Sequence, residues 1–454
     1  MKISFDLTQG SVGPLIRQVA IPASIGFFFN TMFNVVDTYW GGQLSTQSLA
    51  ALSLSFPVYF IIIAVAQGMA VGATALIGAA LGKNDPSQAR LYFLQAVMFS
   101  ALLGIGLTFL GLIVAPSLFG ILGATGEYLD ICLDYMNVIF FGAVFFVLNF
   151  VVNSLLNARG DTRPFRNFLI VGSILNIGLD PWFIYGGFGL PAMGIAGIAL
   201  ATILIQALGL LYLVKKCFDS GLLEHIHLKR LLPKPAIITE IAYQGLPASC
   251  NFATIGIGIF VITYFFSLFG KAPVAAYGVA TRIEQIILLP SIGLNIATLS
   301  IVAQNCGAGR YDRIHETLNT ALRYGFVIMA LGTAIVFFFA NPLVTLFTDD
   351  PAVIDIGTDY LRVMAFLLYA YVVLFVHVAA LQGMKLPMFA IYIGLFRQLL
   401  APAALFSLFA VALDFRLPGI WWSVFVINWL SAGISFFYAR RVLNAQRGCT
   451  EKKQ

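Results

Sequence analysis

Residues 50–81 read AALSLSFPVYFIIIAVAQGMAVGATALIGAAL, an apolar run that contains no charged residue. The run is longer than the roughly 20 residues that a helix needs to cross a bilayer. It lacks the alternation of apolar and polar residues that membrane strands show, and only helices and closed barrels satisfy their backbone hydrogen bonds in lipid. This stretch therefore predicts a transmembrane helix.

The rest of the chain has a similar composition. Of its 454 residues, 60% are hydrophobic and 10% are charged, whereas soluble domains carry about 25% charged residues. Polar breaks divide the chain into twelve expected spans, which lie at about 13–40, 50–81, 90–115, 128–157, 165–185, 192–214, 240–268, 274–305, 316–340, 353–381, 387–411 and 418–440. The sequence therefore predicts an all-α, polytopic membrane protein.

Lysine and arginine are concentrated in alternate loops and in the carboxy-terminal tail, whereas the other loops contain almost none. Cytoplasmic loops of membrane proteins are enriched in these residues, so we expect a multi-pass protein of the cell inner membrane with both termini cytoplasmic. The net charge of +6 then reflects attraction to anionic lipid of the bilayer. No nucleic-acid partner is expected.

The chain also contains an internal repeat. A shift of 225 residues places IPAS (21–24) on LPAS (246–249), AALSL (50–54) on AAYGV (275–279), and DICLDY (130–135) on DIGTDY (355–360). Each copy has six spans, an even number, so the two copies are expected to be parallel repeats with the same orientation. The expected domains are an amino-terminal six-helix lobe (1–214), a cytoplasmic linker (215–239), and a carboxy-terminal six-helix lobe with a short tail (240–454).

Two aspartates inside the spans of the first copy have no acidic counterpart in the second. Asp37 falls on Ile262 under the shift, and Asp180 falls on Ala403 after a slip of two residues. The fold therefore does not require either charge. An ionisable residue within a membrane span is costly, and it usually marks the path of an ion or a substrate.

Asparagines accompany these acids at helical spacing. The stripes are Asn30, Asn34 and Asp37 on the first span, Asn149, Asn153 and Asn157 on the fourth, and Asn176 and Asp180 on the fifth. Polar stripes that faced lipid would be costly, so we expect the three to face one another inside the amino-terminal lobe. The alternative is that these side chains only hold helices together by hydrogen bonds.

Other motifs predict no catalytic or metal chemistry. The five cysteines and four histidines lack metal-ligand spacing, and GAALGKN (78–84) is shorter than a phosphate loop and lacks its final Ser or Thr. No catalytic set appears within the spans, so we expect neither an enzyme nor a cofactor. Glu284 and Arg282 in the eighth span, and Arg397 in the eleventh, are further charged residues without an evident partner.

The chain resembles the multidrug and toxic compound extrusion (MATE) family over essentially its full length. The matching stretches include IPAS, NVVDTYWGG, NSLLNARGDTRPFRN, NIGLDPWFIYG and GLNIATLSIVAQNCGAGRYDR. The resemblance implies two six-helix lobes around a central cleft. It also implies the export of small-molecule drugs and organic cations, often amphipathic, in exchange for protons or sodium ions. We expect the protein to be a monomer.

Within this family the chain is similar to the DNA-damage-inducible F (DinF) branch. That branch has an aspartate in the first helix and Asn-x-x-x-Asp in the fifth, which are matched by Asp37, Asn176 and Asp180. The resemblance implies that these residues couple transport to a cation, with Asn153 as a further member. The proline at which the first helix of the branch bends corresponds to Pro22.

The remaining expectations concern the cargo. Candidate residues of the substrate cavity are Asn30, Asn34, Asn157 and Glu284. An alternative function for a related fold is a flippase for lipids or lipid-linked sugars. Such cargo carries phosphates, and flippases of this kind line the cleft with basic residues, whereas only Arg282 and Arg397 could do so here.

Overall fold

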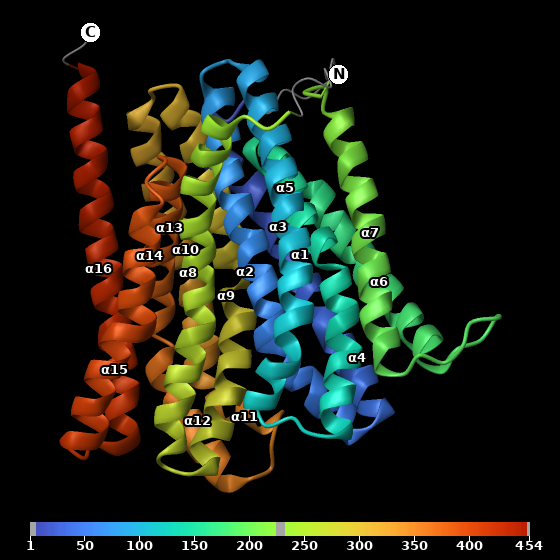
Figure 1. Cartoon of the computed structure of the whole chain (residues 1–454). Coiled ribbons are helices and arrows are strands. Elements are labelled where there is room, and N and C mark those ends of the chain that lie inside the picture. Colours follow the sequence, from blue (N-terminus) through green and yellow to red (C-terminus); the bar gives the residue numbers. More distant parts are fainter. Residues whose placement is uncertain (1–5, 224–231, 452–454) are drawn as a thin grey trace. The chain divides into compact units, whose positions relative to one another are not determined.

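The computed structural model describes residues 6–223 and 232–451, and nearly all of these residues form helices (Figure 1). Within this part of the chain, the only β-type pairing is a single bridge between Gly187 and Leu190. The all-α fold class predicted from the sequence is therefore confirmed.

One compact unit comprises Ile25–Ala253. It contains the second part of α1 (Val12–Leu44), α2 (Thr46–Gly82), α3 (Pro86–Ile121), α4 (Glu127–Phe141), α5 (Ala143–Ala158), α6 (Arg163–Tyr185), α7 (Ile195–Asp219) and the first part of α8 (Pro235–Ser267). Ser45 and Asp85 cap α2 and α3, because their side chains accept hydrogen bonds from backbone N–H groups of the first turn. The expected span 128–157 is a bent pair, in which α4 and α5 meet at Gly142 at an angle of 43°.

The second compact unit comprises Met1–Ser24 and Thr254–Gln454. After the second part of α8 it contains α9 (Lys271–Gly307), α10 (Tyr311–Phe338), α11 (Ala340–Thr345), α12 (Pro351–Met364), α13 (Leu367–Gly383), α14 (Met388–Leu395), α15 (Ala401–Phe406) and α16 (Arg416–Glu451). Two π-helical segments, η2 (Phe396–Leu400) and η3 (Ser407–Ala412), interrupt the expected span 387–411. The last helix extends well past the expected end near residue 440.

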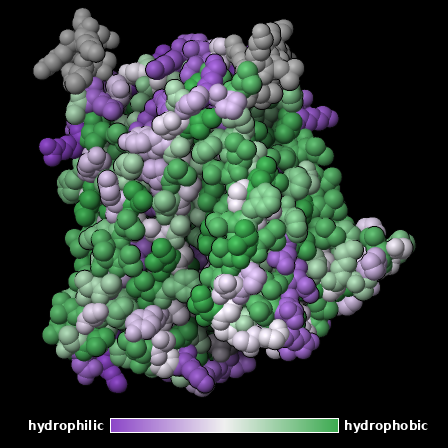
Figure 2. All heavy atoms as spheres, in the orientation of Figure 1, coloured by the Kyte–Doolittle hydropathy of each residue, from purple (hydrophilic) through white to green (hydrophobic). Residues whose placement is uncertain are grey.

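The helices are long and apolar enough to cross a membrane. Ten described helical segments meet this criterion singly, and the total rises to twelve if the α4–α5 and α12–α13 pairs, bent by 43° and 51°, each form one span. Figure 2 shows that most hydrophilic residues on the visible face lie near the helix ends, whereas hydrophobic residues cover the middle. The chain is a multi-pass membrane protein.

Helices α1 and α8 are each shared by the two compact units. The division falls after Ser24 in α1 and after Ala253 in α8, so the units differ from the expected lobes (1–214 and 240–454) in these two segments. Residues 6–24 pack with the carboxy-terminal unit, and α8 up to Ala253 packs with the amino-terminal unit. The expected linker, 215–239, lies partly outside the described residues.

A close contact between a glycine and a serine anchors each exchanged segment. In one unit a Cβ at Gly293 of α9 would overlap Ser24 of α1, and in the other a Cβ at Gly68 of α2 would overlap the backbone of Ser249 of α8. The repeat shift relates these two contacts, because it moves Ser24 to Ser249 and Gly68 to Gly293. Only glycine permits such an approach of two helix backbones.

Polar side chains also hold the segments that lead into the exchanged helices. The Gln304 side chain of α9 accepts a hydrogen bond from the Leu7 backbone at 3.0 Å, and Arg313 of α10 donates to the Gly10 carbonyl at 2.8 Å. In the other unit, Gln95 of α3 bonds to both the Leu232 carbonyl and the Lys234 amide at 2.9 Å. Each exchanged segment is therefore fixed at its beginning.

Candidate functional site

The structure brings together the acids of the first and fifth expected spans. The Asn176 side chain of α6 donates one hydrogen bond to Oδ1 of Asp37 at 3.0 Å and another to Oδ1 of Asp180 at 2.8 Å. Because both oxygens contact the same nitrogen, they lie within about 6 Å of each other, a distance at which two charges interact strongly. All three side chains are buried, with at most 8% of their surface exposed.

Helix geometry sets this arrangement. Asn176 and Asp180 are one turn apart on α6, so their side chains project from the same face. Asp37 lies in the part of α1 that belongs to the same compact unit. The unit therefore assembles a pair of carboxylates with one amide between them.

No basic side chain in the described residues forms an ion pair or a hydrogen bond with either acid. Oδ2 of Asp180 and Oδ1 of Asn176 also lack a hydrogen-bond partner within this part of the chain. Buried carboxylates without a compensating charge are unfavourable. Unpartnered oxygen atoms beside them can accept a proton or coordinate a hard cation, for which oxygen is the preferred ligand.

A small cavity of about 70 Å³ lies beside Asp37. Its polar lining comes from four helices: Asn34, Asp37 and Thr38 of α1, Ser55 and Tyr59 of α2, Tyr135 of α4 and Thr202 of α7. Thr202 also lies 3.5 Å from Oδ2 of Asp37. The cavity can hold a few water molecules, so a small ion could reach the acid from this side.

The asparagine stripe of the first span is placed next to the acid pair but is not bonded to it. Asn34 lines the cavity, while its side-chain amide donates to the Asn30 carbonyl at 3.1 Å. Asn30 is half-buried and does not line the cavity. Of this stripe, only Asp37 takes part in the hydrogen-bond network.

The stripe of the fourth span, on α5, forms separate contacts. Asn149 donates to the side chain and the backbone of Gln206 on α7. Asn153 is buried, and its Oδ1 has no hydrogen-bond partner among the described residues. Asn157 is half-buried in the last turn of α5. None of the three is hydrogen-bonded to the acid pair.

Sequence reasoning missed Thr202, Tyr59 and Tyr135. These side chains carry no charge and are common in apolar helices, so the sequence alone does not indicate that they lie beside Asp37. The repeat supplied one signal, because the shift of 225 places Tyr59 on Glu284 and Tyr135 on Tyr360. The second copy thus has polar residues at the positions that surround the acid in the first.

Glu284 of α9 and Arg397 of η2 are two charged residues that lie inside spans of the carboxy-terminal unit. Oε1 of Glu284 is buried and has no hydrogen-bond partner within the described residues. Arg397 donates to Asn428 at 3.0 Å and lies 5.7 Å from the centre of the Tyr371 ring. The two charges form no ion pair with each other or with another described residue. Arg282, on the same helix as Glu284, is exposed.

Pro22 lies inside α1, buried within the carboxy-terminal unit and two residues before the point at which this helix passes to the other unit. Proline cannot donate a backbone hydrogen bond within a helix, which weakens the helix locally. The repeat places Pro247 at the corresponding position of α8. Both shared helices therefore carry a proline close to their division.

Comparisons with known proteins agree with this architecture. A family model described as MatE matches residues 22–182 and 247–405, two segments that begin 225 residues apart, at 22 and 247. The chain is 28% identical to a protein of Shewanella oneidensis named FAD transporter, over 99% of both chains. It is 26% identical to the multidrug export protein MepA of Staphylococcus aureus, over 91% of this chain and 90% of that protein.

A solved structure described as a MATE in the bent conformation is also similar. It has a TM-score of 0.92 and 27% sequence identity, and the match covers 99% of both chains. The likeness therefore extends over the whole fold.

Proposed function

Because the chain belongs to the MATE family of membrane transporters, which are not enzymes, we propose that it exports small organic molecules across the inner membrane in exchange for protons or sodium ions. The observation that supports ion coupling is the buried pair of Asp37 and Asp180, which both accept a hydrogen bond from the side-chain amide of Asn176. An ion that binds to this pair neutralises charge at a place where no basic side chain of residues 6–223 or 232–451 does so.

The coupling follows from that neutralisation. A proton or a sodium ion would bind to the oxygen atoms of Asp180 and Asn176 that lack a hydrogen-bond partner among the described residues. Its binding would change the hydrogen bond that Asn176 donates to Asp37 on α1. An organic cation that interacts with Asp37 from the cavity would compete for the same charge. Exchange results when the ion and the cargo favour different conformations of the protein.

The bend at Pro22 is the second element of the proposal. Asp37 lies four turns beyond Pro22 on α1, and Asn176 connects that part of the helix to α6. A change in this hydrogen bond would therefore favour or oppose bending of α1 at Pro22, where the helix lacks a backbone hydrogen bond. In this scheme Asn153 supports the ion site, and Asn30, Asn34 and Asn157 contact the cargo.

Cationic and amphipathic drugs are the proposed cargo. The support comes from the negative charge beside the cavity and from the relative named multidrug export protein MepA. In the carboxy-terminal unit, Glu284 is proposed as a further contact for a cationic cargo. We also propose that the protein works as a monomer with both termini cytoplasmic, as the lysine and arginine distribution suggests.

A second candidate cargo carries phosphate. It is favoured by the relative named FAD transporter, which matches 99% of this chain. Arg397, which has no carboxylate partner among the described residues, could bind a phosphate beside the aromatic ring of Tyr371. FAD fits this chemistry, and so does the lipid-linked sugar of a flippase, although one such arginine offers less charge than a diphosphate requires.

Transport into inverted membrane vesicles tests the proposal. A fluorescent organic cation and FAD would be supplied separately, with an imposed pH gradient, an imposed sodium gradient or no gradient. We expect the cationic dye to accumulate only with one of the gradients. Accumulation that does not depend on either gradient would refute ion exchange, and gradient-driven uptake of FAD alone would favour the second cargo.

A further inference from the structure

The two helices α6 and α7 leave an apolar groove on the amino-terminal unit. They run side by side in Figure 1, and a groove of about 420 Å³ lies between them. Its apolar lining includes Phe168, Val171, Leu175, Ile205 and Leu208. The volume falls within the range of ligand sites in proteins, roughly 300–1,000 Å³. Both helices are long and apolar enough to span the membrane, so an acyl chain is a suitable occupant of the groove.

One end of the groove is polar and lies next to basic residues. Asn167 of α6 and Tyr212 of α7 line this end. Arg163 lies one turn before Asn167, and Lys216 lies one turn after Tyr212, so both are about 6 Å beyond the groove along their helices. A groove for an acyl chain thus opens next to positive charge.

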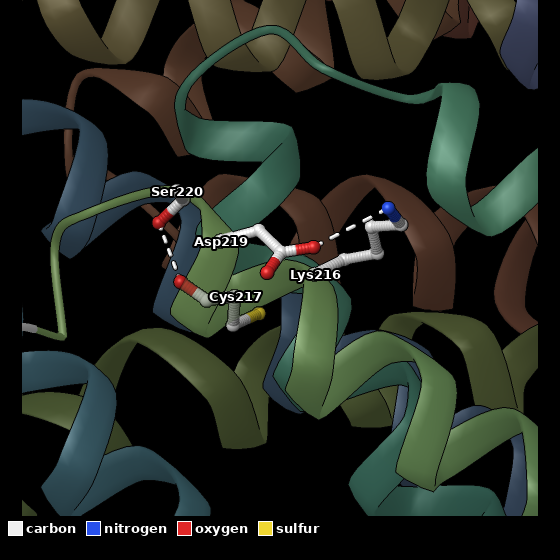
Figure 3. A network of polar contacts seen from close by, with 4 residues as sticks. All are labelled: Lys216, Cys217, Asp219 and Ser220. Atoms are coloured by element: carbon white, nitrogen blue, oxygen red, sulfur yellow. Dashed lines mark hydrogen bonds and ion pairs between the residues drawn. The ribbon is translucent and has the colours of Figure 1, made fainter. Parts of the chain in front are cut away.

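The contacts of these basic residues leave charge available. Lys216 lies over the Tyr212 ring at 5.8 Å and pairs with Asp219 at 3.3 Å, as Figure 3 shows for the ion pair. Neighbouring Lys215 is exposed and has no ion pair within the described residues, and the Arg163 side chain is also exposed.

The two helix ends are also fixed to each other. Arg159, in the turn before α6, donates to the Ser220 carbonyl after α7 at 2.7 Å. In Figure 3 the Ser220 hydroxyl donates to the Cys217 carbonyl, which closes the end of α7. The basic groups are therefore presented from a fixed turn. The segments that end here, 159–166 and 215–219, contain five basic residues and two acidic ones.

From this geometry we propose that the groove is a binding site for an anionic phospholipid. One acyl chain lies between α6 and α7, and the phosphate lies against Arg163 and Lys215, with Tyr212 and Asn167 at the level of the glycerol. Basic pockets between membrane helices recognise anionic headgroups in this way. The site is separate from the acid pair and does not depend on the proposed transport activity.

Native mass spectrometry of the full-length protein tests the site. Phosphatidylglycerol and phosphatidylcholine with identical acyl chains would be added at equal concentration, and the bound lipid would be counted. We expect phosphatidylglycerol to bind in preference. Removing one basic residue should weaken its binding about fivefold, since each contributes about 1 kcal/mol near an anionic surface. The variants are Arg163→Gln and Lys215→Gln.

Matched controls separate the site from general effects. Arg441→Gln removes an exposed charge from another helix and should leave binding unchanged. Leu208→Trp fills the groove and should reduce binding of both lipids, whereas Leu211→Trp, three residues away on the exposed side of α7, should not. Equal binding of the two lipids by the unaltered protein would overturn the proposal, as would full binding by Leu208→Trp. Displacement of phosphatidylglycerol by inorganic phosphate alone would show that the groove contributes nothing, and would also overturn it.

Discussion

Replacing Asp37 with asparagine is the sharpest test of the acid pair. The amide has nearly the same shape, and its oxygen can still accept the hydrogen bond from Asn176 that the carboxylate accepts at 3.0 Å. Asp180 keeps the hydrogen bond that it accepts from Asn176 at 2.8 Å. One hydrogen bond becomes neutral and loses about 1 kcal/mol, while one of two neighbouring buried charges disappears. We therefore expect Asp37→Asn to unfold at the same temperature or higher.

Ion binding should respond in the opposite way. A hydrogen bond or ligand contact to a charged group contributes about 1.5–3 kcal/mol. Loss of the charge at Asp37 should weaken binding of the coupling ion about 10- to 100-fold. The assay is gradient-driven efflux of a fluorescent cation from proteoliposomes, with thermal unfolding measured on the same preparation. Binding of the cargo without a gradient should persist, since the neutral amide resembles the ion-neutralised acid.

The control is Asp134→Asn, which removes an exposed carboxylate from α4 in the same unit. It should leave efflux and stability unchanged. Normal gradient-driven efflux by Asp37→Asn would refute the reasoning, because the carboxylate would then have no part in coupling. A large loss of stability would show instead that the acid holds helices together. Asp180→Asn should give the same pattern, equal or weaker in size.

Three further predictions concern the helices. Gly68→Ala should lower the free energy of unfolding by about 1–3 kcal/mol in chemical denaturation, because the new Cβ meets the Ser249 backbone. Gly106→Ala, which has open space around it, should not lower it. Equal effects of the two changes would contradict the close contact. Pro22→Ala restores a backbone donor and should reduce transport more than expression. Normal export by this variant would show that bending of α1 at Pro22 is not part of the transport cycle. Glu284→Gln should weaken apparent dye affinity in efflux assays without changing the ion dependence, and an altered ion dependence would assign Glu284 to coupling instead.

Much of the fold could be predicted because long apolar runs determine membrane helices. The run at 50–81 forms α2 at Thr46–Gly82, and the repeat offset of 225 recurs in the two family matches. The bends at Gly142 and near Ala365 could not be predicted, since hydropathy is continuous through them. The sharing of α1 and α8 between units was also missed, because a sequence repeat assigns each helix wholly to one copy. Gly68 and Gly293 contact the exchanged segments of α8 and α1, but a glycine in a sequence does not indicate which helix will pack against it.

Only the charged residues of the candidate site, and the asparagine spaced one helical turn from one of them, could be predicted from the sequence. Asp37, Asn176 and Asp180 were found because acids within apolar runs are rare and the helical spacing joined two of them. The structure adds which atoms meet, and it makes Asn176 the link between the two acids. The asparagines of α5 have the same spacing but contact other residues, since periodicity indicates a shared face of one helix and not its neighbour.

The second copy serves as an internal control for the role of the acids. It repeats the bend within the fourth expected span, which is 51° between α12 and α13 and 43° between α4 and α5, and it repeats the contact between glycine and serine. It does so with Ile262 in place of Asp37 and Ala403 in place of Asp180. Since the same architecture forms without these acids, folding does not explain them.

Glu284 is an acid inside the second span of the second copy. It lies at the position of Tyr59, on a different helix from Ile262, the counterpart of Asp37. It has no amide bridge and no second carboxylate among its described hydrogen bonds and ion pairs, so it can neutralise one charge but cannot hold an ion between two acids. The two copies therefore offer different chemistry on one scaffold. A paired site in the first copy suits a small ion, and a single acid in the second suits one positive charge on a larger molecule.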